Sequence, residues 1–259
     1  MKTYKNLPKK ISNLLLLKKK FLVPKFYFYK FAKYKINKKE ILNKVRKEFN
    51  NVIIRSAYSE EDQDGLSNAG KFLSIPNIKS IDALKLDLSI NRVVNSYKMQ
   101  NPNNQYFILQ EMVNKVSQSG VVFAKNEVNG VPSVKINFSN QNETNSITSG
   151  KKNGSIIYYI YQNKNKLLDR ININKINDVI KTLLKFVNPL DLEFCIDKKN
   201  KLYLLQIRKL NLPRNHFNKA KYINSLKNFE KKLKKLLNIP LPTIHGKFTI
   251  FSTMPDWNP

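Results

Sequence analysis

The stretch LDLEFCIDKKNKLYLLQIR, residues 190–208, constrains the fold of this chain more than any other segment. It predicts two short apolar strands joined by a polar turn at residues 198–201. Side chains of a strand alternate between the two faces of a sheet, so the apolar residues of both strands share one face. We expect that face to be core, formed by Leu192, Phe194, Ile196, Tyr203, Leu205 and Ile207.

The opposite face of this hairpin gathers polar side chains at the end away from the turn. With a four-residue loop, antiparallel pairing sets Glu193 opposite Gln206 and Asp191 opposite Arg208. One interpretation is a solvated face with a cross-strand ion pair. The other is a metal–phosphate site, because carboxylate and amide oxygens suit Mg²⁺ and an arginine can hold the phosphate that the metal bridges. The hairpin by itself does not decide between them.

The bulk composition is that of a globular protein of a reducing compartment. A chain of 259 residues with 41% hydrophobic content can bury a core in one large domain or two lobes. Its single cysteine, Cys195, excludes an internal disulfide framework. The apolar run Leu14–Leu17 is too short for a signal peptide, and no run approaches the length of a membrane span. We therefore predict a cytoplasmic protein.

The net charge of +29 comes almost entirely from lysine. Readers of nucleic-acid grooves favour arginine, whose planar fork binds bidentately, and only six of the 47 basic residues are arginines. The sequence thus predicts no specific nucleic-acid partner, although weak, salt-sensitive adhesion to polyanions is expected.

The order of expected elements favours an α+β fold with two lobes over a doubly wound sheet. Helices are expected after Asn37, from Ser80 to about Tyr97, and at residues 176–187. A short strand, 51–57, places Arg55 at its end, and later strands are expected at 106–113, 119–126, 132–139 and 155–162. After a linker, a basic amphipathic helix from Tyr222 to Leu237 either docks onto its own domain or touches a membrane surface or partner.

Several common chemistries are absent from the sequence. It contains neither a P-loop nor a G-x-G-x-x-G fingerprint, and two histidines (His216, His245) with one cysteine make no convincing zinc site or triad. What remains is Arg55 in IIRSAYSEEDQDGLSNAG. This arginine is suited to gripping a phosphate, or alternatively to an ion pair with Glu60, Glu61 or Asp62.

Taken together, these stretches resemble one family. IIRSAYSEED…GLSNAG is similar to the V-R-S-S-x-x-x-E-D…S-x-A-G segment of the ATP-binding domain of pyruvate, phosphate dikinase and phosphoenolpyruvate synthase. ILQEMV…SGVVFAKNEVNG resembles its hinge, V-Q-x-M-V…S-G-V-x-F-T-x-x-P-x-T-G. LDLEFCID…KLYLLQIRKL resembles its D-I-E-W-x-x-D…L-Y-I-L-Q-x-R-P-L ending. The motifs occur in the family's order over roughly residues 10–210.

The resemblance implies an ATP-grasp fold whose two α+β lobes, residues 1–100 and 101–210, enclose a nucleotide cleft. Residues 211–259 would be a linker, the basic helix and the start of a further domain. It implies ATP and Mg²⁺ as cofactors, with Glu193 and Gln206 at the metal–phosphate centre and Asp191 beside them. The phosphates would be held by Arg55 and Arg208, as catalytic residues, and by Lys10, which matches the early lysine of G-G-K-x-x-x-L. The adenine would meet the segment Gln110, Met112 and Val113.

The sequence departs from the family pattern at defined positions. Pro8-Lys9 replaces the Gly-Gly, Ala57 the second serine of R-S-S, and Lys209 the proline after Gln-x-Arg. The G-G-x-x-S-H-A motif of the phosphate-carrying histidine has no counterpart, so the resemblance implies a partner chain or downstream domain that carries it.

Two segments resemble a narrower group. PSVKINFSNQNETNSITSG and MPDWNP are similar to a surface-polysaccharide-locus subgroup that includes an L-glutamine kinase. In that subgroup the MPDWNP motif continues into further domains, so we expect a truncated chain or a split-gene subunit. The expected activity is ATP-dependent phosphoryl transfer to a small molecule such as glutamine or pyruvate, for modification of surface polysaccharide. The alternatives are an inactive remnant and a lysine-driven protein that binds polyanions.

Overall fold

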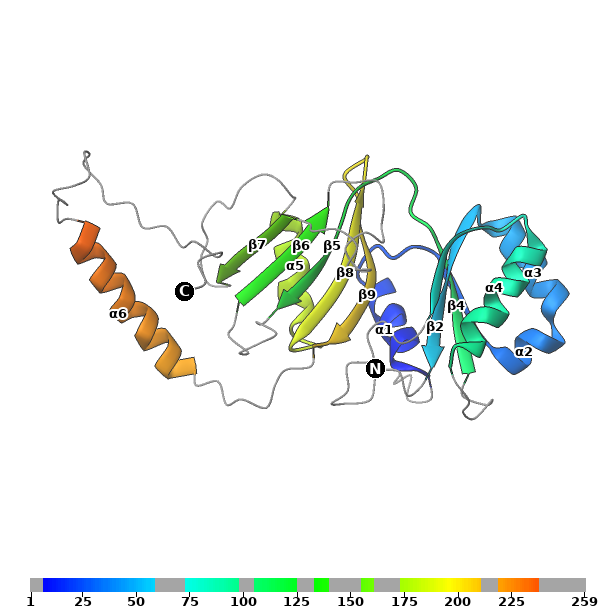
Figure 1. The fold of residues 1–259 in the computed structure, drawn as a ribbon, viewed down its shortest axis with the longest axis horizontal. Helices are drawn as coiled ribbons and strands as arrows, with labels where there is room; N and C mark the ends of the chain where they lie inside the picture. Colours follow the sequence, from blue (N-terminus) through cyan, green and yellow to red (C-terminus); the bar gives the residue numbers. More distant parts are fainter. Residues whose placement is uncertain are drawn as a thin grey trace, which may run out of the picture. The chain divides into compact units, whose positions relative to one another are not determined.

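The computed structural model describes residues 7–58, 73–97, 105–124, 133–139, 155–160, 173–210 and 219–237 (Figure 1). The helices are α1 (Lys9–Lys18), α2 (Phe31–Ile36), α3 (Lys38–Glu48), α4 (Ala83–Asn95), α5 (Ile173–Leu183) and α6 (Lys219–Leu237). The strands are β1 (Phe26–Lys30), β2 (Asn51–Tyr58), β3 (Ser74–Lys79), β4 (Gln105–Glu111), β5 (Val116–Ala124), β6 (Ser133–Ser139), β7 (Ser155–Ile160), β8 (Leu190–Asp197) and β9 (Leu202–Lys209). They form two antiparallel sheets with helices on their faces, which confirms the predicted α+β class.

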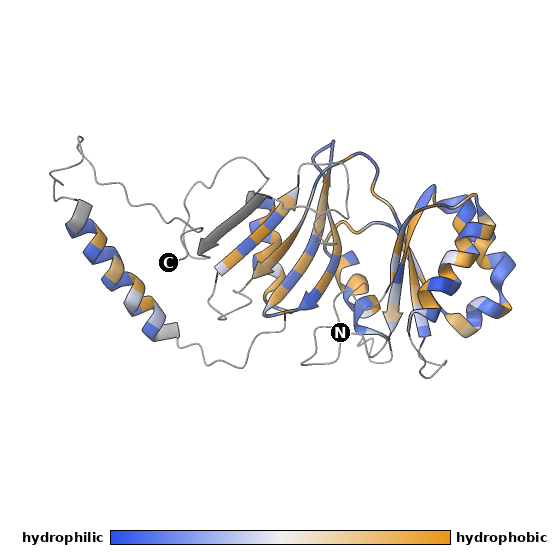
Figure 2. Cartoon of the chain, viewed as in Figure 1, coloured by the Kyte–Doolittle hydropathy of each residue, from blue (hydrophilic) through white to orange (hydrophobic). Residues whose placement is uncertain are grey.

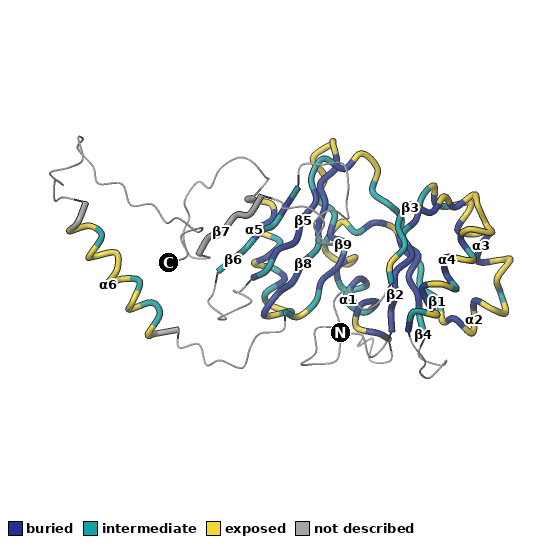
Figure 3. Tube along the Cα trace, in the orientation of Figure 1, coloured by how far each residue is buried: buried dark blue, intermediate teal, exposed yellow. Residues whose placement is uncertain are grey.

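The first sheet has the strand order β1-β4-β2-β3 and carries α2, α3 and α4 on one face. Alternate residues of β2 and β4, such as Val52, Ile54 and Leu109, pack against the apolar sides of these helices. The odd-numbered positions of β2 therefore face away from the helices, since neighbouring side chains of a strand point to opposite faces. Figure 3 shows the central strands β2 and β4 largely buried and exposed positions along the helices.

The start of α4 corrects one sequence prediction. The helix begins after Asp82, whose carboxylate accepts a hydrogen bond from the backbone N–H of Lys85 at 2.9 Å. Ser80, the predicted cap, instead donates its hydroxyl to the backbone oxygens of Phe49 and Asn50. Serine and aspartate are both good caps. Ser80 does not cap α4 because its hydroxyl binds the backbone that directly follows α3.

The second sheet has the order β7-β6-β5-β8-β9, with α5 packed on one face. In β6 apolar and polar residues alternate (Figure 2), so that Val134, Ile136 and Phe138 are buried in the core beneath α5. Lys135 and Asn137 consequently lie on the opposite face. This opposite face also carries the polar ends of β8 and β9.

The β8–β9 hairpin has the predicted pairing at its functional end, where Glu193 is opposite Gln206 and Asp191 is opposite Arg208. A shift of register between Glu193 and Phe194 leaves Leu205 without a partner residue on β8. The expected core positions Tyr203 and Leu205 are therefore wrong: both are half-buried, and Leu204 packs in the core instead.

Helix α1 lies against both sheets. Leu17 belongs to the core of the second sheet, whereas Ile11 and Leu14 pack with Ala57 and Ile108 of the first. The Asn13 side chain donates to the backbone oxygen of Ile207 at 2.9 Å, which fixes the helix to β9. Since α1 contacts the face of the first sheet opposite its other helices, it positions the polar residues of β2 near those of β8 and β9.

The remaining compact unit, residues 214–259, is described through α6 alone. Between Lys221 and Lys235 this helix is mostly exposed, with half-buried positions at Tyr222, Ile223, Leu226 and Leu233. Glu230 pairs with Lys234 one turn later at 2.9 Å. Among the described residues, no helix has the length and apolar character needed to cross a membrane.

Gly120 allows the core of the second sheet to close. It lies on β5 directly between Phe138 and Phe194, and an added Cβ would come within 2.5 Å of the Asn137 backbone oxygen and 2.8 Å of the Phe194 ring. We expect Gly120→Ala to lower the free energy of unfolding by about 1–3 kcal/mol in urea titrations, because the core has no room for the methyl group.

The double variant Gly120→Ala/Phe194→Leu separates the two contacts of that methyl group. In the Phe194→Leu background, Gly120→Ala should still lower the free energy of unfolding, but by less than it does in the parent. Shortening Phe194 removes one contact of the methyl group, whereas the contact with the Asn137 carbonyl involves backbone and remains. An alanine variant as stable as the parent would contradict this account of the packing.

Candidate functional site

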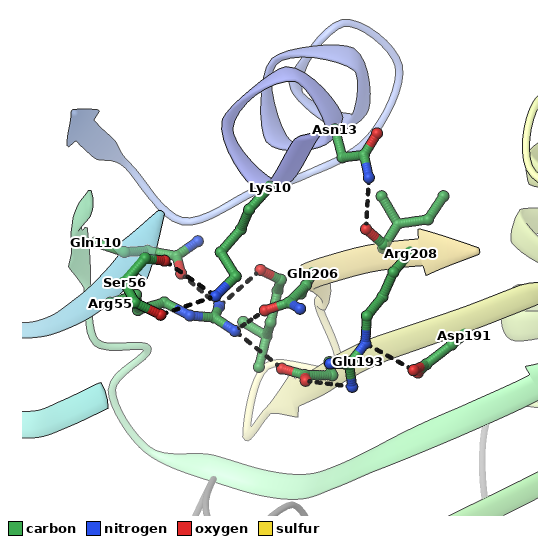
Figure 4. Close-up of polar contacts among 11 residues, drawn as sticks. Lys10, Asn13, Arg55, Ser56, Gln110, Asp191, Glu193, Gln206 and Arg208 are labelled. Carbon is green, nitrogen blue, oxygen red and sulfur yellow. Dashed lines mark hydrogen bonds and ion pairs between the residues drawn. The ribbon is translucent and has the colours of Figure 1, made fainter. Parts of the chain in front are cut away.

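Arg55 is the centre of the polar cluster in Figure 4. The sequence predicted it at the end of a strand, but β2 continues to Tyr58 and holds Arg55 in its interior. Being an odd-numbered residue of β2, it points away from α2–α4 and towards the hairpin of the second sheet. Arg55 is 8% exposed, so its charge needs partners within the protein.

Four acceptors surround the Arg55 guanidinium. Its Nη1 donates to Gln110 Oε1 at 3.1 Å and to the backbone oxygen of Leu205 at 3.0 Å. Its Nη2 donates to Glu193 Oε2 at 3.2 Å and to Gln206 Oε1. Of the two interpretations of Arg55, the observed ion pair is thus with Glu193; Glu60, Glu61 and Asp62 lie outside the described residues.

The bulge at Leu205 in β9 lies at the contact with Arg55. Leu205 is the residue without a partner on β8, and its carbonyl accepts from Arg55. A bulge leaves the extra residue outside the regular ladder, which makes its backbone groups available to other partners. The same irregularity sets Gln206 opposite Glu193, so both side chains reach the guanidinium from one end of the hairpin.

Arg208 forms a second ion pair at the same end of the hairpin. Its Nε donates to Asp191 Oδ2 at 2.7 Å, and its Nη2 lies 3.7 Å from Glu193 Oε1. Burial raises the pKa of the Asp191 carboxyl to about 6, although Arg208 acts in the opposite direction. Glu193 is therefore held between two guanidinium groups, one from each sheet, whereas Asp191 pairs with Arg208.

Lys10 approaches the cluster from α1. The ammonium is buried and donates to the backbone oxygen of Ser56 at 3.0 Å and to its hydroxyl at 3.3 Å. Ser56 follows Arg55 on β2, and Figure 4 shows the Lys10 side chain directed to this point. The position predicted from the early lysine motif thus lies beside Arg55, although Pro8-Lys9 precedes it.

The three residues predicted to meet adenine lie in different surroundings. Gln110 is 2% exposed and accepts a hydrogen bond from Arg55 on the neighbouring strand β2. Met112 and Val113 are half-buried and follow the end of β4, where the chain passes from the first sheet to the second. The Met112 backbone N–H donates to the Asn51 oxygen at 2.9 Å, so this amide is engaged within the first sheet.

The cluster contains most of the buried polar atoms that lack a partner. Among the described residues these atoms are Arg55 Nε, Gln110 Nε2, Asp191 Oδ1 and Asn137 Oδ1. Buried polar groups in folded proteins are nearly always paired, and exceptions point to strain, function or an unseen water or ion. Three of these four belong to residues already contacting one another around Arg55 and Arg208.

The fourth residue, Asn137, was not predicted from any motif. It is opposite Val121 on β5, which is opposite Glu193 on β8. Residues in one cross-strand row share a face, so Asn137 extends the polar row about 10 Å beyond Glu193, given two strand spacings. The alternation of β6 gave its face, but sequence alone did not relate β6 to β8.

The donor set has the chemistry of a magnesium site. Glu193, Gln206 and Asp191 provide carboxylate and amide oxygens, the ligands that Mg²⁺ prefers, and Asp191 Oδ1 is unpartnered. Within the described ranges, no three His, Cys, Asp or Glu side chains form a cluster of their own. The residues therefore fit a cation that shares its coordination with a ligand such as phosphate, rather than an ion enclosed by protein groups.

Comparisons with known proteins identify no family. No family model matches the chain, and no curated protein matches it. The fold is similar to D-alanyl-alanine synthetase A of Vibrio cholerae (TM-score 0.44, 10% identity, 86% of this chain and 65% of that one). It is also similar to a RimK domain ATP-grasp protein of Sphaerobacter thermophilus (0.43, 10%, 87% and 63%). A third is the dinucleotide-forming acetyl-coenzyme A synthetase 1 of Ca. Korarchaeum cryptofilum (0.48, 10%, 78% and 92%).

The chain spans less than two thirds of the first two of these proteins. TM-scores below 0.5 at this identity establish neither a shared activity nor a shared site.

Asn137 offers a test of the unpartnered groups that is independent of any ligand. Replacing an unsatisfied buried acceptor by an apolar group of similar shape removes a penalty of about 1–3 kcal/mol. We expect Asn137→Leu to raise the melting temperature of the ligand-free protein by roughly 2–4 °C per kcal/mol gained.

Asn137→Asp is the matched control, because it keeps the shape and adds charge. It should lower the melting temperature, since a carboxylate would be buried in the row of Glu193. If the leucine variant is destabilised as much as the aspartate variant, Asn137 is satisfied in the native state.

Proposed function

We propose that this chain binds ATP with Mg²⁺ at the Arg55 cluster and is the nucleotide-binding part of an ATP-grasp phosphotransferase of the phosphoenolpyruvate synthase type. The observation that carries the proposal is the convergence of five side chains at one place, where Arg55 Nε and the neighbouring Asp191 Oδ1 are buried without a partner. The five are Lys10, Arg55, Glu193, Gln206 and Arg208. They come from α1, β2, β8 and β9, and they are the residues that the sequence motifs share with that family.

The chemistry of phosphoryl transfer suits this set of side chains. The protein's main tasks in that reaction are to position the phosphates and to offset their charge. Arg55 and Arg208 offer planar guanidinium forks that match phosphate oxygens, and the Nε of Arg55 is an unused buried donor. Lys10 on α1 adds a third cation, which donates to Ser56 beside Arg55 on β2.

Glu193 and Gln206 would hold the magnesium ion, with Asp191 beside them. When bound, this ion would bridge phosphate oxygens and neutralise charge that develops on them. Asp191 orients Arg208 through the 2.7 Å hydrogen bond, and Arg208 in turn lies against Glu193. These contacts fix the direction from which a phosphate would meet both arginines.

The phosphoryl acceptor would be provided by a phosphohistidine domain on a separate chain or in a further part of the protein. The support is in the sequence, which contains the nucleotide motifs but no G-G-x-x-S-H-A motif. The resemblance of PSVKINFSNQNETNSITSG and MPDWNP to the surface-polysaccharide subgroup suggests a role in modifying such polymers.

Labelled ATP tests this part of the proposal. With Mg²⁺ and β- or γ-labelled ATP, label should enter pyruvate or glutamine products only when a histidine-bearing domain is added, because acceptor and donor must be held in line. Multiple turnovers by the chain alone, or rapid stoichiometric labelling of His216 or His245, would contradict it.

Nucleotide binding itself is testable by thermal shift. A ligand that binds only the folded state adds about 2.7 kcal/mol at a hundredfold excess over Kd, or roughly 5–10 °C for a chain of this size. Mg-ATP should give such a shift, and Glu193→Gln should remove most of it, because the charge that holds the cation is lost. Asp178→Asn, at an exposed carboxylate of α5, is the matched control and should leave the shift intact.

The charge of +29 favours one second candidate, a protein that binds polyanions through its lysines. Affinity for a polyanion such as heparin or DNA would fall steeply with salt and would be indifferent to Glu193→Gln. The absence of any shift with millimolar ATP, ADP or AMP, together with such salt-dependent binding, would replace the nucleotide proposal by this one.

A further inference from the structure

The Arg55 guanidinium occupies the place of a cation between the two residues proposed to hold the metal. A single nitrogen, Nη2, donates both to Glu193 Oε2 and to Gln206 Oε1. The second Glu193 oxygen, Oε1, lies 3.7 Å from Arg208 Nη2. Both oxygens of this carboxylate thus already face positive charge, as Figure 4 shows.

The charges around this point disfavour a free divalent cation. Three cationic side chains, Lys10, Arg55 and Arg208, accompany two carboxylates, Asp191 and Glu193. This group therefore carries a net positive charge when the carboxylates are ionised. A metal ion arriving alone would be repelled by the guanidinium groups, whereas the phosphates of a nucleotide would be attracted.

The contacts of Arg55 also allow it to exchange partners. Nη1 is held by Gln110 Oε1 and the Leu205 carbonyl, neither of which is a proposed metal ligand, while Nη2 alone engages Glu193 and Gln206. Nε is buried without a partner and is free to donate to an incoming oxygen. A small rotation of the Arg55 guanidinium, with Nη1 kept in place, would release Glu193 Oε2 and Gln206 Oε1. It would turn Nη2 and Nε towards a phosphate.

We propose that Arg55 is an internal counter-cation that excludes free divalent metal from Glu193 and Gln206. The metal binds there only together with a nucleotide, because the nucleotide phosphates then accept the hydrogen bonds of the Arg55 guanidinium. The proposal rests on the proposed function, because it assumes that this cluster binds a nucleotide and its metal. It gives Arg55 a role in setting the order of binding in addition to holding phosphate. Metal and nucleotide affinities are then coupled, and the coupling is reciprocal.

Mn²⁺ binding to the full chain tests this role without any measurement of activity. Free Mn²⁺, followed by electron paramagnetic resonance, should bind the parent protein weakly. Arg55→Met removes the charge but keeps an unbranched side chain, and it should raise the affinity for free Mn²⁺ by at least about tenfold. Arg92→Met, at an exposed arginine of α4, is the matched control for net charge and should leave that affinity unchanged.

The parent protein gives a second measurement that does not depend on the folding of a variant. Its affinity for the non-hydrolysable analogue β,γ-imido-ATP should rise at least about tenfold when Mn²⁺ is present. Equal affinity with and without Mn²⁺, or free Mn²⁺ binding no more tightly to a folded Arg55→Met protein than to the parent, would overturn the role of Arg55 and leave nucleotide binding intact. Failure of the parent to bind the analogue under any condition would instead overturn the proposed function, and this inference with it.

Discussion

The burial of the Arg55 guanidinium between the two sheets is the constraint on which the rest of the site depends. An arginine does not lose its proton in proteins, so a buried one must be surrounded by acceptors. Here the acceptors come from three strands: Gln110 on β4, Glu193 on β8, and the Leu205 carbonyl with Gln206 on β9. The end of the β8–β9 hairpin is thereby held against β2, and α1 covers the junction with Ile11, Leu14 and Leu17.

This arrangement is a poor choice for stability alone. The buried pair Arg55–Glu193 and the half-buried pair Arg208–Asp191 cost desolvation that apolar residues of similar volume would avoid. Three polar atoms of these residues and of Gln110 have no partner. Burial even raises the pKa of Asp191 despite its contact with Arg208. Such costs are typical of sites whose groups are completed by a ligand. A phosphate with its cation would provide acceptors for Arg55 Nε and a partner for Asp191 Oδ1.

The pairs expected from the spacing of the hairpin, Glu193–Gln206 and Asp191–Arg208, are observed, but a four-residue turn does not set them. Beside the turn Ile196 pairs with Leu202, and the bulge at Leu205 restores the expected register. The shift at Leu205 did not follow from the sequence, and the Leu205 carbonyl accepts a hydrogen bond from Arg55, 150 residues earlier in the chain. The depth of Arg55 within β2 was missed because the polar loop after it suggested that the strand had ended.

The other differences between sequence and structure depend on contacts that are distant in the chain. The alternation of PSVKINFS gives the face of Asn137, but only the order β6-β5-β8 brings that face into the row of Glu193. Ser80 and Asp82 are both suitable helix caps, and the choice between them depends on contacts of Ser80 with the end of α3 that periodicity does not reveal. Lys10 was predicted only through the match of KISNL to the early lysine motif of the family.

If Arg55 admits metal only together with a nucleotide, its side chain must change partners when both bind. The most direct measurement is a crystal structure of the chain with Mg²⁺ and a non-hydrolysable ATP analogue, compared with one grown without either. The account predicts a cation coordinated by Glu193 and Gln206, with the Arg55 Nη2 moved from these oxygens to a phosphate. A nucleotide bound elsewhere, or a bound nucleotide with Arg55 still paired to Glu193 as at present (3.2 Å), would contradict it.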